Sequence, residues 1–96
     1  MIRVAIVTGA SQGIGRATAL RLARDFGVVV LVAREQRGLD DTAAEVRRAG
    51  AEAMTQAVDL HDGGVAVAVI DATLQRYGRI DALLNIAGAV PQVNLF

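Results

Sequence analysis

Three glycines near the amino terminus form the pattern with the clearest chemical meaning. They lie in the segment Thr8-Gly9-Ala10-Ser11-Gln12-Gly13-Ile14-Gly15, between a short apolar run and a stretch of helical periodicity. Gly9 permits a sharp turn off a strand, while Gly13 and Gly15 let a diphosphate approach the backbone and let the helix pack close to the sheet. Free amide hydrogens and the dipole at a helix start favour phosphate charge. The segment therefore predicts a phosphate-binding turn, and a purely structural turn is the alternative.

The turn does not match the phosphate loop of nucleoside triphosphatases. That loop requires Gly-Lys-Ser/Thr after four intervening residues. All ten basic residues of this chain are Arg, and none is Lys. The spacing also departs from the common Gly-x-Gly-x-x-Gly order.

The end of the second apolar run bears on the charge of the cofactor. An Asp or Glu at this place in a dinucleotide-binding fold binds the ribose hydroxyls of NAD. Here the run ends Val32-Ala33-Arg34, and a guanidinium can hold a phosphate through two parallel N–H donors. We expect Arg34 to favour NADP over NAD, with help from Arg37. The alternative is a solvated Arg34, or one that pairs with Glu35.

Apolar runs alternate with helical segments along the chain. The predicted strands are residues 4–7, 28–33, 51–58 and 80–85, and the predicted helices are residues 14–26, 39–49 and 64–77. Residues 65–70 favour a strand by propensity alone, but Leu74 and Tyr77 continue an apolar helix face and Gly78 supplies a stop. An irregular tail is predicted through Pro91.

This alternation predicts an α/β, Rossmann-like three-layer fold with a parallel sheet of about four strands in the order 3-2-1-4. Such a sheet binds its ligand outside the carboxyl ends of the strands, where the order reverses. That point lies between the first and fourth strands, so residues 8–15 and 85–88 should face the ligand.

Composition excludes several classes of function. The 96 residues suffice for one domain, and a net charge of zero argues against nucleic-acid or membrane-surface binding. Absence of Cys excludes thiolate sites, and the single His61 leaves little for a metal site, so no metal is expected. We expect His61 to be an exposed loop residue. The longest apolar stretch, residues 28–33, is too short to cross a bilayer, and no secretory signal is evident, which predicts a cytoplasmic protein.

Three landmarks together resemble the short-chain dehydrogenase/reductase family, in order and in distance. They are the glycine spacing, the pair Asp59-Leu60, and the segment Leu84-Asn85-Ile86-Ala87-Gly88, in which Ile86 replaces the second Asn of the family's Asn-Asn-Ala-Gly. The resemblance covers essentially all 96 residues. It implies cofactor contacts from Gly9, Ser11, Gln12, Gly13, Ile14, Gly15, Arg34, Asp59, Leu60, Asn85, Ala87 and Gly88.

The resemblance also implies individual roles. Asp59 would accept a hydrogen bond from the adenine amino group, and a strand-end cap is its alternative role. Asn85 would stiffen the central sheet beside the adenosine ribose, and a turn-forming residue is the alternative. Gln12 stands where many NADP users of the family carry a second basic residue.

The family transfers hydride between a nicotinamide and a carbonyl or alcohol substrate, with a Ser and a Tyr-x-x-x-Lys pair that follow this segment. Tyr77 is followed four residues later by Asp81, and the chain has no Lys. The resemblance therefore implies the cofactor-binding front part of an oxidoreductase, residues 1–96, ending before the catalytic half, with a homo-oligomer as the intact form.

If the chain is only this front part, we expect the fourth strand to be an open edge and one face of the sheet to be covered mainly by a single helix. A non-catalytic nucleotide-binding or regulatory module is the alternative. A methyltransferase-like domain is disfavoured, because its adenosyl cofactor usually wants an acid where Ala33 and Arg34 stand.

Overall fold

The computed structural model describes residues 2–86 and 92–95. Five strands and three helices alternate in the order β1 (Val4–Thr8), α1 (Gly13–Leu22), β2 (Val28–Ala33), α2 (Gln36–Arg48), β3 (Glu52–Ala57), α3 (Val65–Tyr77), β4 (Ala82–Asn85) and β5 (Gln92–Leu95). Each predicted strand and helix is present. Among the described residues no helix combines the length and the hydropathy that crossing a bilayer requires.

The strands form one sheet in the order β3-β2-β1-β4-β5. Pairings among β1 to β4 are all parallel, which confirms the predicted order 3-2-1-4. The prediction that the fourth strand is an open edge was wrong, because β5 pairs antiparallel with β4. An uncovered strand edge offers free N–H and C=O groups, and an antiparallel neighbour needs no crossover helix to reach it.

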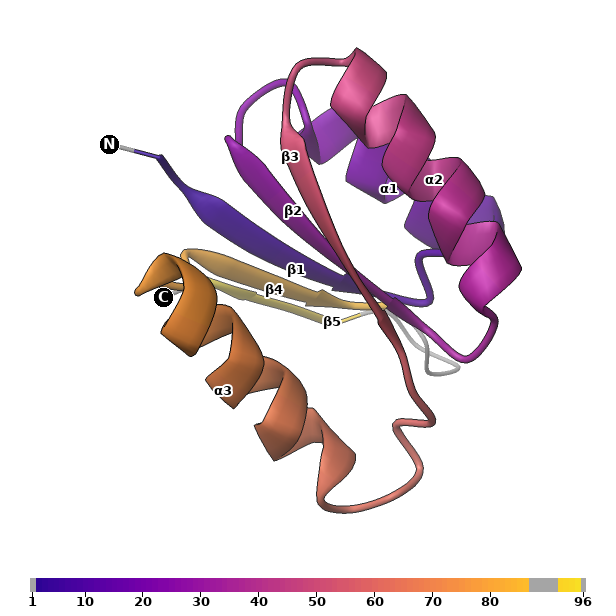
Figure 1. Ribbon diagram of the computed structural model, residues 1–96, viewed down its shortest axis with the longest axis vertical. Coiled ribbons are helices and arrows are strands. Elements are labelled where there is room, and N and C mark those ends of the chain that lie inside the picture. Colours follow the sequence, from indigo (N-terminus) through magenta and orange to yellow (C-terminus); the bar gives the residue numbers. More distant parts are fainter. Residues whose placement is uncertain (1, 87–91, 96) are drawn as a thin grey trace.

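The helices cover the two faces of the sheet unequally. Figure 1 shows α1 and α2 side by side on one face and α3 alone on the other, as predicted. Val67 and Leu74 of α3 remain 60% and 43% exposed. The residues of β1 and β2 that face α3 are nevertheless buried.

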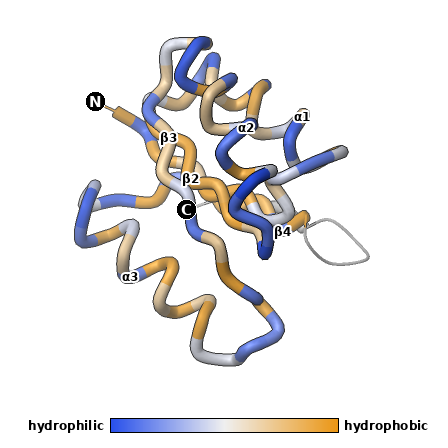
Figure 2. The backbone as a smooth tube through the Cα atoms, turned by 45° about the vertical axis from the view of Figure 1, so that its right-hand side comes forward, coloured by the Kyte–Doolittle hydropathy of each residue, from blue (hydrophilic) through white to orange (hydrophobic). Residues whose placement is uncertain are grey.

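The central strands β1 and β2 are buried on both faces. Alternate residues of β2 point to opposite sides of the sheet, so Val29 and Leu31 pack towards α1 and α2, whereas Val28, Val30 and Val32 pack towards α3. Figure 2 shows the hydrophobic colour along β2. A continuous, Val-rich apolar run is typical of a parallel strand between two helix layers.

Two helix boundaries differ from the prediction by more than one residue. The first helix ends at Leu22 instead of Phe26, because the amides of Arg24 and Asp25 bond to the carbonyls three residues back, those of Arg21 and Leu22, as in a 3₁₀ turn. The second begins at Gln36, three residues early, and the Gln36 side chain donates to Asp40 one turn on. The predicted stop of α3 is confirmed, since Gly78 adopts the left-handed conformation with φ 77°.

Candidate cofactor-binding site

The glycine turn connects β1 to α1 at the carboxyl edge of the sheet. Gly9 and Gly13 have φ of 66° and 58°, values that favour glycine. Gln12 precedes the helix in extended conformation, and no side chain in the described part of the chain caps the helix start. The first amides of α1 are thus available to an anion.

Two glycines of this turn serve different purposes. A Cβ on Gly15 would lie 1.9 Å from the Gly9 carbonyl oxygen, so the helix packs directly on the turn. A Cβ on Gly13 would meet nothing within 4 Å. Gly15 therefore closes the turn on itself, whereas Gly13 opens onto free space where a ligand could approach.

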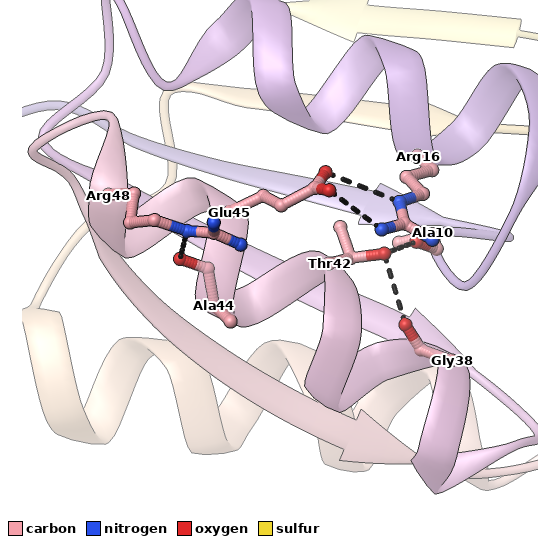
Figure 3. A network of polar contacts seen from close by, with 7 residues as sticks. All are labelled: Ala10, Arg16, Gly38, Thr42, Ala44, Glu45 and Arg48. Carbon is pink, nitrogen blue, oxygen red and sulfur yellow. Dashed lines mark hydrogen bonds and ion pairs between the residues drawn. The ribbon is translucent and has the colours of Figure 1, made fainter.

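The turn is anchored to α2 through a buried hydroxyl. Thr42 Oγ1 lies 2.8 Å from the Ala10 carbonyl oxygen and 3.1 Å from that of Gly38, as Figure 3 shows. The Ala10 amide donates to the Val32 carbonyl of β2. Gly38 lies against Ser11, since a Cβ there would be 2.7 Å from Ser11 Cβ. Both the amide and the carbonyl of Ala10 are thus hydrogen-bonded, which holds the turn in one conformation.

An ion pair links the two helices on the same side. Arg16 Nη2 of α1 donates to Glu45 Oε1 of α2 at 2.9 Å (Figure 3). The hydrogen bond from Arg16 lowers the pKa of the Glu45 carboxyl. This contact joins α1 to the helix that anchors the turn.

The strand order reverses between β1 and β4, and polar groups meet there. The Thr8 hydroxyl donates to Asn85 Oδ1 at 2.8 Å and accepts from the Ile86 amide at 2.8 Å. Thr8 is buried. Asn85 therefore holds the ends of β1 and β4 together. Ala87 and Gly88 lie outside the described residues.

A cavity of about 530 Å³ opens at this edge of the sheet. Its volume lies within the range of small-molecule sites, about 300–1,000 Å³. Among the predicted contact residues, the following line it: Gly9, Ser11, Gln12, Gly13, Ile14, Gly15, Arg34, Asp59 and Leu60. The structure thus brings residues from the ends of β1, β2 and β3 around one space.

Several lining residues were not predicted, and one predicted residue lies elsewhere. Glu35, His61 and Ile86 also line this cavity. Asn85 lines instead a smaller, apolar cavity of about 300 Å³ beside α3, which shares Leu60 and His61 with the first. For His61, its position next to the Asp59-Leu60 pair in the sequence was the one feature that could have indicated that it lines the cavity.

The cavity combines an apolar surface with opposite charges. Ile14, at the start of α1, is 68% exposed, although it is a large apolar side chain. Arg34 is exposed at the end of β2. Hydrogen bonds from the backbone and ring of His61, together with the charge of Arg34, lower the pKa of the Asp59 carboxyl. A ligand with an apolar surface, an anionic group and a hydrogen-bond donor would match these features.

Tyr77 lies far from this cavity. Its hydroxyl donates to Glu52, the first residue of β3, at the amino edge of the sheet. Burial and the Glu52 carboxylate raise the pKa of Tyr77. Tyr77 therefore connects α3 to β3 through its side chain.

No cluster of three or more potential metal ligands occurs in residues 2–86.

Comparisons with known proteins agree with this arrangement. The family model for short chain dehydrogenase matches residues 3–95. The 1,6-dihydroxycyclohexa-2,4-diene-1-carboxylate dehydrogenase of Acinetobacter baylyi is 40% identical over 89 residues, covering 92% of this chain and 34% of that protein. The chain thus spans about a third of the length of the curated relative.

Solved structures give the same result. A variant of actinorhodin polyketide ketoreductase with NADPH superposes with a TM-score of 0.81 and 39% identity, covering 88% of this chain and 32% of that one. NAD⁺-bound xylitol dehydrogenase superposes with a TM-score of 0.78 and 34% identity, and the match covers 82% of this chain and 30% of that one. The fold, the glycine turn and the family model lead to one conclusion: the chain belongs to the short-chain dehydrogenase family.

Proposed function

We propose that these residues form the NADP-binding part of an oxidoreductase that transfers hydride between a nicotinamide and a carbonyl or alcohol substrate. The observation that supports this most strongly is the cavity that joins the glycine turn, Arg34 and Asp59. In such a fold the paired phosphates lie at the first turn and the ribose lies at the end of the second strand. The uncapped start of α1 and the exposed Arg34 suit a pyrophosphate and a 2′-phosphate.

The reacting groups of the proposed enzyme are not among these 96 residues. The chain has one Tyr and no Lys, so no Tyr-x-x-x-Lys pair is available. Bound nicotinamide would supply the hydride, and these residues would bind and orient the cofactor. The chain would also stiffen the crevice floor through Thr8 and Asn85. We place the whole enzyme in the cytoplasm as a homo-oligomer.

A non-catalytic nucleotide-binding module is the second candidate, since residues of the glycine turn, Arg34 and Asp59 line one cavity while these 96 residues hold no Tyr-x-x-x-Lys pair. The family assignment does not fit the methyltransferase alternative. The two remaining candidates differ in one observable: the coding sequence beyond Phe96 should encode a Ser and a Tyr-x-x-x-Lys if the protein is the enzyme. A stop codon there would favour the module.

Cofactor titrations test the binding proposal. We expect NADPH to bind more tightly than NADH, and Arg34→Asp to reverse that order. A charge-assisted phosphate contact contributes about 1.5–3 kcal/mol, which corresponds to roughly 10- to 150-fold in the dissociation constant. Arg24→Asp makes the same charge change at an exposed residue after α1, at the opposite end of the sheet. An unchanged preference in Arg34→Asp would refute the role of Arg34, and absence of binding to either nucleotide would refute the proposed function.

A further inference from the structure

His61, the only histidine of the chain, holds one oxygen of Asp59 by two bonds. Its amide donates to Asp59 Oδ1 at 3.0 Å, and its ring Nδ1 lies 3.0 Å from the same oxygen. Within residues 2–86 no donor reaches Asp59 Oδ2. The two side chains are 90% and 54% exposed, yet both residues line the larger cavity. One carboxylate oxygen is thus occupied and the other is left to accept a bond.

The strand order places this pair where a nucleotide base would lie. Phosphates at the end of β1 and a ribose at the end of β2 leave the base to extend further in the same direction. The next strand in that direction is β3. Asp59, Leu60 and His61 follow β3 directly and border the cavity.

We propose that His61 is a positioning residue that fixes Asp59 so that its second oxygen selects adenine at this end of the cavity. This inference rests on the proposed dinucleotide function. The exocyclic amine of adenine donates a hydrogen bond, which an ionised carboxylate accepts. Hypoxanthine carries a carbonyl oxygen at the same place, which a fixed carboxylate repels. Without the ring contact the Asp59 side chain gains rotational freedom and discriminates less.

The test compares NADP with its hypoxanthine analogue, nicotinamide hypoxanthine dinucleotide phosphate. Both ligands carry the same phosphates and ribose, so the ratio of their dissociation constants isolates the base. We expect the unmodified protein to prefer adenine by roughly tenfold, the value of one hydrogen bond to a charged group. The backbone bond from residue 61 persists in every variant, so His61→Ala should reduce this ratio by about fivefold rather than abolish Asp59 function.

Two further variants separate positioning from other roles. His61→Asn places an amide nitrogen near the position of ring Nδ1 and should restore the ratio. Asp62→Asn alters the neighbouring residue, whose carboxylate bonds Gly64 and not Asp59, and should leave the ratio unchanged. The inference would be overturned by an unchanged ratio in His61→Ala, including one in which both ligands bind equally more weakly. It would also be overturned if His61→Asn failed to restore the ratio, or if Asp62→Asn reduced the ratio to a similar extent. These results would leave dinucleotide binding intact. Failure of the unmodified protein to bind either ligand would instead overturn the proposed function on which it rests.

Discussion

Thr8 Oγ1 and Asn85 Oδ1 lie 2.8 Å apart at the carboxyl ends of two adjacent parallel strands, β1 and β4. The same hydroxyl accepts the Ile86 amide, so one side chain is bonded to two successive residues of the other strand's end. These bonds set the separation of the strands where their order reverses. The shape of the crevice therefore depends on a buried hydroxyl as well as on the backbone ladder.

We predict that Thr8→Val lowers the free energy of unfolding by about 1–3 kcal/mol, because it leaves the Ile86 amide and the Asn85 oxygen without this partner. Thr8→Ser keeps the hydroxyl and should lose much less. Urea denaturation of both variants measures the difference. Equal stability of Thr8→Val and Thr8→Ser would show that the hydroxyl contributes nothing.

Gly15 and Gly13 should respond differently to the same added methyl group. Gly15→Ala places a Cβ 1.9 Å from the Gly9 carbonyl oxygen, and overpacking of this kind costs about 3 kcal/mol or more. Gly13→Ala meets no atom within 4 Å and incurs only the left-handed backbone strain at φ 58°, about 1–2 kcal/mol. Denaturant unfolding should therefore rank Gly15→Ala as the less stable variant, and the reverse ranking would contradict the geometry.

The buried hydroxyl of Thr42 should matter for ligand affinity as well as for stability. Thr42→Val keeps the shape but leaves the Ala10 carbonyl without its bond from α2, at a cost of about 1–3 kcal/mol. Since that bond fixes the turn, we also expect weaker NADPH binding. Thr73→Val is a matched control: Thr73 is equally buried, but its hydroxyl bonds Val69 within α3. Loss of affinity in Thr73→Val but not in Thr42→Val would exclude the anchoring role.

Asp81 should make stability depend on pH in acid. Hydrogen bonds from Arg79 and then from the Val4 amide lower the pKa of the Asp81 carboxyl. A carboxyl whose pKa is lower in the folded state stabilises the fold above its unfolded pKa, about 4, and that contribution is lost as pH falls through the folded pKa. The stability difference between the unmodified protein and Asp81→Asn should thus shrink from pH 5 to pH 2. Asp71→Asn, at an exposed residue of α3, provides the control. A difference that stays constant over this interval would contradict the assignment.

The sequence allowed the order of the strands and most of the cavity to be predicted. The continuous, Val-rich apolar run of β2 is typical of a strand that is buried on both faces, and parallel strands joined by short helices restrict the winding. Once the winding is known, the ends of β1, β2 and β3 must share one edge. Gly9, Arg34 and Asp59 meet there for that reason.

Contacts between elements could not be predicted in this way. The bond between Thr42 and Ala10, and the approach of Gly38 to Ser11, depend on how closely α2 packs against the turn. The pairing of β5 with β4 depends on where the chain reverses direction. The local strand propensity of Gln92–Leu95 does not predict this pairing. His61 was predicted only as an exposed residue, because its contact with Asp59 arises from the loop conformation.

A crystal structure with bound NADPH tests the central claim most directly. We predict that the paired phosphates lie against the turn from Gly9 to Gly15, within hydrogen-bond distance of amides at the start of α1, with the 2′-phosphate beside Arg34. A nucleotide bound elsewhere, or a turn whose amides are all bonded within the protein, would contradict it.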